Sequence, residues 1–148
     1  MTQMPALPVT FRPHRTRAVL LLSGAVAAAA ITLVALLLES LAPGERASFV
    51  LVALLLLGVL ALLSRPRVTA ARDGVTVVNL TTTRRLEWAE VVRVNLRPGD
   101  PWVTLDLTDG TSLPAMGIQP GIAREQALTD ARALRALVDR YGTAAPSA

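Results

Sequence analysis

The sequence predicts a two-helix transmembrane hairpin followed by a small α+β domain, in which a curved antiparallel sheet is capped by a C-terminal helix. Three observations predict this fold. Two long uncharged apolar runs occupy the first part of the chain, apolar and polar residues alternate in the middle, and a helical repeat of apolar residues comes last. The predicted segments are a basic N-terminal segment, 1–17, the hairpin, 18–64, the folded domain, 65–141, and a disordered tail, 142–148.

The two apolar runs are each long enough to cross a bilayer. The first, 18–38, has 21 uncharged residues, and the second, 47–63, has 17. A helix needs roughly 20 apolar residues, with a range of about 17–25, to span the hydrocarbon core. The rest of the chain is too small to bury two helices that are apolar on every face. Pro43 and Gly44 lie between the runs and allow the chain to reverse.

Arginines flank the hairpin on both outer sides, with Arg12, Arg15 and Arg17 before it and Arg65, Arg67 and Arg72 after it. The loop between the runs, 39–46, contains a single arginine. Arginines near a membrane span tend to stay in the cytoplasm. The sequence therefore predicts an integral plasma-membrane protein with two spans and both termini in the cytoplasm.

The alternative is a signal peptide. The arginine-rich start and the alanines at 25–30 fit one loosely, and cleavage would leave a secreted or exported antigen-like protein. The apolar region of a signal peptide is usually only about 7–15 residues long. The first run is longer than this and is soon followed by a second one, which favours an uncleaved anchor.

From Val68 onward the pattern predicts short strands joined by tight turns. The Asp-Gly pairs at 73–74 and 109–110 are typical of hairpin loops. Two prolines and a glycine in 97–101 predict a loop, and Pro114 indicates a sheet edge or a strand end. The predicted strands are 68–71, 75–79, 84–88, 91–96, 102–107 and 111–114.

The last part of the domain reads as an amphipathic helix. Its apolar face, spaced by three or four residues, consists of Leu128, Ala131, Leu134, Val138 and Tyr141. A curved antiparallel sheet whose open end is closed by such a helix is the layout of a pleckstrin-homology-like (PH-like) domain.

Several motifs carry a resemblance to a known family. They are the Asp73-Gly74 hairpin, the strand leading to Asn79, the pair Arg84-Arg85, the run LEWAEV at 86–91 and the second hairpin at 105–111. With these, residues 65–113 resemble the bacterial PH domain of the actinobacterial low molecular weight protein antigen 6 family. The resemblance implies a membrane-tethered PH-like domain and brings no assigned reaction with it.

Four residues are candidates for a role in binding or in the core. Arg84 and Arg85 follow a predicted turn, where they could contact lipid headgroups or an acidic partner. The competing interpretation is an ordinary solvated hairpin. Trp88 and Trp102 are expected to be structural anchors, because a tryptophan ring buries a large apolar area.

The composition argues against catalysis. The chain has no cysteine and one histidine, all 15 of its basic residues are arginine, and neither apolar run holds an ionisable residue. We therefore expect no catalytic residues, no cofactor and no metal site. Charges of both signs are mixed after Ser64, which argues against a nucleic-acid-binding face.

These observations predict a non-enzymatic binding or scaffolding module held at the cytoplasmic face of the membrane. Its expected partners are the lipid bilayer and a protein at the membrane. The alternative function is a domain that senses anionic lipid through Arg84, Arg85 and neighbouring arginines.

Overall fold

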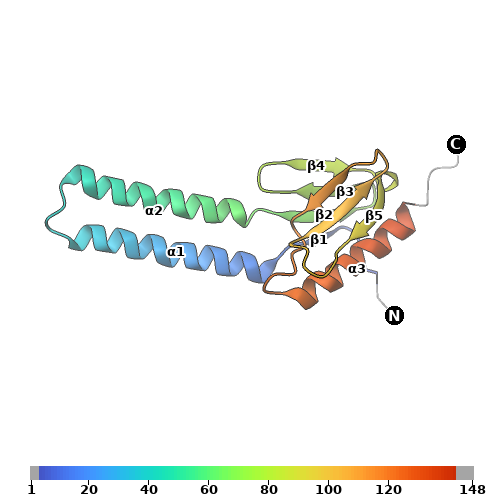
Figure 1. The fold of residues 1–148 in the computed structure, drawn as a ribbon, viewed down its shortest axis with the longest axis horizontal. Helices are drawn as coiled ribbons and strands as arrows, with labels where there is room; N and C mark the ends of the chain where they lie inside the picture. The colour runs from blue at the N-terminus through green and yellow to red at the C-terminus, as the bar shows by residue number, and fades with distance from the viewer. Residues whose placement is uncertain (1–3, 143–148) are drawn as a thin grey trace. The chain divides into compact units, whose positions relative to one another are not determined.

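The computed structural model describes residues 4–142, which divide into two compact units. One unit combines Met1–Pro13 with Pro66–Ala148, and the other is His14–Arg65. The helical unit is thus inserted into the chain of the other unit, between its first and second strands (Figure 1). Of the predicted tail, 142–148, all but Gly142 lies outside the described residues.

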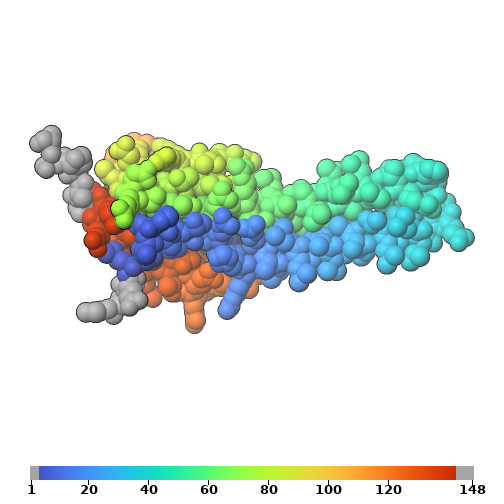
Figure 2. Space-filling model, turned by 180° about the vertical axis from the view of Figure 1, so that it is seen from behind, coloured from blue at the N-terminus to red at the C-terminus, as the bar shows by residue number. Residues whose placement is uncertain are grey.

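The inserted unit is a pair of helices, α1 (His14–Leu37) and α2 (Pro43–Leu63), which lie side by side (Figure 2). Small residues form their interface, since Gly24, Ala35 and Ala53 are the buried positions. A Cβ added at Gly24 would lie 2.7 Å from Leu60 Cδ1. Both helices are long and apolar enough to cross a membrane, by length and composition.

The other unit contains two antiparallel sheets and a terminal helix. The first sheet has the order β1 (Val9–Phe11), β2 (Arg67–Ala71), β3 (Gly74–Val78) and β4 (Thr83–Leu86). The second has the order β5 (Val91–Asn95), β6 (Val103–Leu107) and β7 (Ser112–Ala115). A short 3-10 helix, η1 (Trp88–Glu90), connects the sheets, and α3 (Arg124–Tyr141) follows the second one.

This architecture confirms the predicted fold class, with several differences in detail. The third predicted strand, 84–88, ends at Leu86, because Trp88 already belongs to η1. The last helix begins at Arg124, one turn before the first residue of the predicted apolar face. Pro114 lies in β7, an outer strand, as its missing N–H group requires.

The strand β1 was not predicted. It lies within the segment expected to be a basic N-terminal extension, and it pairs with β2 through Val9 to Ala70 and Phe11 to Val68. The Phe11 side chain is 5% exposed and belongs to the core of the domain. The sheet therefore takes its outermost strand from before the helical unit.

One core joins the two sheets and α3. Its buried residues include Val68 and Val75 of the first sheet, Leu105 of the second, and Leu134 and Leu137 of α3. Burying such side chains stabilises each by roughly 1.5–3 kcal/mol relative to leaving them in water. Short strands of alternating pattern are thus held by a single apolar interior.

Two polar contacts fix how the sheets meet. The Asn79 amide donates to the Pro114 carbonyl at 2.8 Å, and its oxygen accepts the Met116 N–H at 3.1 Å. The loop after β7 also approaches β2 closely, because a Cβ added at Gly117 would lie 2.6 Å from the Arg67 backbone. Asn79 is one of the two buried polar residues of the described chain, and these bonds satisfy it.

Candidate functional site

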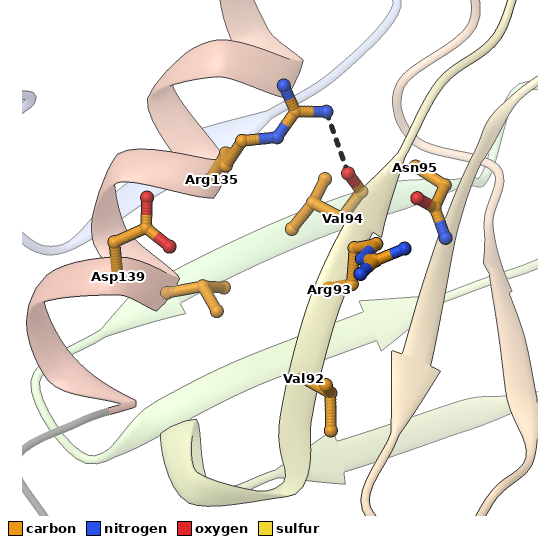
Figure 3. Close-up of a pocket in the computed structure, with 7 residues that line it drawn as sticks. Val92, Arg93, Val94, Asn95, Arg135 and Asp139 are labelled. Carbon is orange, nitrogen blue, oxygen red and sulfur yellow. Dashed lines mark hydrogen bonds between the residues drawn. The ribbon is translucent and has the colours of Figure 1, made fainter.

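An open pocket of about 310 Å³ lies where β5 runs beside α3 (Figure 3). We call it the β5–α3 groove. The residues that line it include Val92, Arg93, Val94, Asn95, Arg135 and Asp139. Because β5 is an outer strand of its sheet, one side of its backbone faces this groove rather than another strand.

A β-bulge shapes the floor of the groove. The register of β5 against β6 shifts between Val91 and Arg93, so that Val92 and Arg93 are both exposed. Val92 is 60% exposed, which is high for a valine within a strand. A bulge bends a strand and redirects its side chains, and bulges are common at sheet edges and binding sites.

The helix side of the groove supplies charge. Arg135 Nη2 donates to the Val94 carbonyl at 2.8 Å, as Figure 3 shows, and so caps part of the outer edge of β5. Arg93 and Arg135 bring two positive charges to the groove, and Asp139 brings one negative charge. The groove therefore combines a strand edge, an exposed valine and an excess of positive charge.

Arg84 and Arg85 do not form one cluster. They are neighbours in β4, where successive side chains point to opposite faces. Arg85 forms an ion pair with Asp73, and Arg84 lies 3.9 Å from the Asp109 carboxylate. Each arginine is thus matched by the aspartate of a different hairpin turn.

Asp109 is held by its own turn as well as by this ion pair. Its Oδ1 accepts the Thr111 hydroxyl at 2.6 Å and the Thr111 N–H at 2.9 Å. These two bonds, and then the charge of Arg84, lower the pKa of Asp109 from its ordinary value of 3.8. The carboxylate is exposed, and its bonds to Thr111 stabilise the turn.

The two tryptophans occupy different environments. Trp88 is buried in the core, its Nε1–H donates to the Ala71 carbonyl at 2.9 Å, and its ring stacks on Tyr141 with centroids 5.7 Å apart. Trp102, by contrast, is half-buried, precedes β6 and lies outside the buried core. The expected role of structural anchor therefore suits the position of Trp88 and not that of Trp102.

The two antiparallel sheets and the terminal helix are consistent with a PH-like domain. Residues 65–137 match the family model described as Bacterial PH domain. These residues are similar to bacterial PH domains, and two helices that are long and apolar enough to span a membrane precede them in the chain. No solved structure matches the chain.

The chain is also similar to mycobacterial proteins. An uncharacterized protein of Mycobacterium bovis and two of Mycobacterium tuberculosis are each 34% identical to it over 88 residues. The aligned part covers 60% of this chain and 56% of each relative, so the chain spans little more than half the length of the relatives it matches. The narrower resemblance to the low molecular weight protein antigen 6 family is not confirmed by these comparisons.

PH domains are generally non-catalytic binding modules. Within residues 4–142, no group of three or more histidine, aspartate or glutamate side chains is placed to hold a metal ion. The residues of the β5–α3 groove were not identified from the sequence. The adjacent Val91 and Val92 interrupt the alternation of β5, and this was the available signal for the bulge.

Proposed function

We propose that this protein is a membrane-anchored, non-enzymatic binding module whose PH-like domain and both ends lie on the cytoplasmic side. The observation that carries this proposal is the position of the helical pair in the chain. β1 precedes α1 and β2 follows α2, yet the two strands pair in one sheet. A chain that crossed the membrane once between these strands would place them on opposite sides, so their pairing supports two crossings.

The surface of the helical pair supports a bilayer as its surroundings. Of the residues in α1 and α2, only Gly24, Ala35 and Ala53 are buried. The outward residues include many leucines and valines, such as Leu22, Leu37 and Val52, which are 55–70% exposed. So large an apolar surface would be unstable in water and is stable in hydrocarbon. The flanking arginines assign the cytoplasmic side.

The pairing of β1 also bears on the signal-peptide alternative. Cleavage near the alanines at 25–30 would remove β1 and with it Phe11, a core residue. The second strand would then become an uncovered edge. An uncleaved first helix keeps β1 and Phe11 in the domain, which favours the anchor over the signal peptide.

Protease protection of a chain tagged at both ends tests the topology. Both tags should be resistant in intact spheroplasts and should be cleaved together in inverted vesicles. A control protein with a known periplasmic tag should be cleaved in the spheroplasts. Tags on opposite sides, or loss of the N-terminal tag from the mature chain, would overturn the proposal.

The β5–α3 groove is the surface that we propose for the partner, and the partner is an extended acidic segment of a membrane protein. An extended segment can add to an outer strand through main-chain hydrogen bonds. Arg93 and Arg135 favour acidic side chains, and Val92 offers an apolar contact. Membrane tethering raises the local concentration of both molecules, so modest affinity suffices.

Selection of peptides from a random display library on the full chain in nanodiscs tests this partner. The enriched peptides should be acidic, and their binding should be lost in an Arg93→Glu/Arg135→Glu variant. Arg132→Glu, which changes the charge of α3 outside the groove residues, is the matched control and should retain binding. Enrichment of neutral or basic peptides, or equal loss in the control, would contradict an acidic partner.

A further inference from the structure

A second open pocket, of about 330 Å³, lies at a different place on the same unit. Two arginines line it, Arg72 from the turn after β2 and Arg140 from the last turn of α3. Tyr141 and Pro5 provide ring and apolar surface beside them. We call this the arginine pocket. It shares no lining residue with the β5–α3 groove.

Among residues 4–142, two arginines and no acidic side chain line the arginine pocket, so its described lining is positively charged. The acids adjacent to its arginines in the chain do not line it. Asp73, next to Arg72, forms its ion pair with Arg85. Asp139, next to Arg140, lines the β5–α3 groove. Two guanidinium groups therefore face one open space without a carboxylate in its lining.

A chain of contacts connects the backbone next to Arg72 with the side chain of Arg140. Trp88 Nε1–H donates to the carbonyl of Ala71, the residue before Arg72. The Tyr141 ring stacks on the Trp88 ring. The Arg140 guanidinium lies over the Tyr141 ring, 5.7 Å from its centroid. Such cation–π and stacking contacts restrict the side chains. The pocket is thus partly organised before any ligand binds.

We propose that the arginine pocket binds a phosphate monoester. Arg72 and Arg140 bind the phosphate oxygens, since the planar fork of a guanidinium matches phosphate with paired, charge-assisted hydrogen bonds. Pro5 and the ring of Tyr141, both half-buried, contact the organic part of the ester. The volume lies at the lower end of the range for small-molecule sites, roughly 300–1,000 Å³, which suits a small ester or a lipid headgroup.

Titration of the full chain in phosphatidylcholine nanodiscs with glycerol 3-phosphate tests the proposal by calorimetry. Arg72→Gln and Arg140→Gln should each weaken binding by about tenfold or more, because each removes a charge-assisted contact. The double variant should show no binding, and Arg132→Gln should bind like the unaltered chain. Matching near-ultraviolet circular dichroism spectra verify that each variant is folded. Retained binding in the double variant, or an equal loss in Arg132→Gln, would overturn the proposal.

A second arm distinguishes a lipid from a soluble ester. Nanodiscs that contain phosphatidic acid present the same phosphate monoester at the membrane. If these discs weaken the binding of glycerol 3-phosphate relative to discs with phosphatidylglycerol, a phosphodiester of the same sign, the ligand is the lipid headgroup. If the two kinds of disc give equal affinities, the ligand is a soluble ester. Failure of the peptide selection at the groove would leave this test unaffected.

Discussion

Replacement of Phe11 by alanine tests whether the segment before α1 is an integral part of the PH-like domain. The Phe11 side chain is 5% exposed, packs in the core and pairs in register with Val68. Truncating a buried phenylalanine costs about 3–5 kcal/mol. We expect the lower end, about 3 kcal/mol, because a three-residue outer strand can relax more than a central one. Domains of this size have total stabilities of about 5–15 kcal/mol, so the loss is large.

Hydrogen exchange measured by mass spectrometry on the full chain in nanodiscs is the assay. A loss of about 3 kcal/mol corresponds to a roughly 100-fold decrease in protection of the amides that join β1 and β2. Thr10→Ala is the control, since Thr10 is exposed in the same strand and its hydroxyl forms a hydrogen bond of 3.3 Å with the Thr69 hydroxyl. If Phe11→Ala lowers protection no more than Thr10→Ala does, β1 does not contribute to the core as described.

Three further predictions concern the domain. Gly117→Ala should destabilise it by about 1–3 kcal/mol in urea unfolding, because a Cβ there would lie 2.6 Å from backbone atoms, whereas Gly121→Ala, with nothing within 4 Å, should change it little. Trp88→Phe should cost about 1–3 kcal/mol, since it leaves a carbonyl of β2 without its donor; an unchanged urea midpoint would contradict this. Asp109 has a lowered pKa in the folded state, so its contribution to stability is present above the unfolded pKa and is lost as pH falls through the folded pKa. The urea midpoints of the unaltered chain and of Asp109→Asn should therefore differ at pH 7 and converge at acid pH. A difference that stays constant with pH would refute this linkage.

The strands with local turn signals were predictable from the sequence. Asp73-Gly74 and Asp109-Gly110 mark hairpins because their glycines adopt positive φ, of 154° and 82°. The terminal helix was predictable for the same reason, since its apolar repeat lies within one continuous segment. Local chemistry was sufficient wherever an element and its closest partner are adjacent in the chain.

β1 could not be predicted in this way. Val9–Phe11 is short, lies between prolines, and pairs with residues on the far side of both apolar helices. The binding surfaces are also non-local. Adjacency suggested Arg84 and Arg85 as a pair, but a strand directs neighbours to opposite faces. Arg72 and Arg140 are distant in the chain, and only the fold brings them to one pocket.

The order of the elements also has a consequence for biogenesis. The N-terminal strand is translated well before the strand with which it pairs, and the hydrophobic helices are made in between. In the proposed topology, the growing polypeptide therefore delivers those helices to the insertion machinery while its first strand is still unpaired. Completion of the domain then follows, rather than precedes, arrival of the nascent chain in the bilayer.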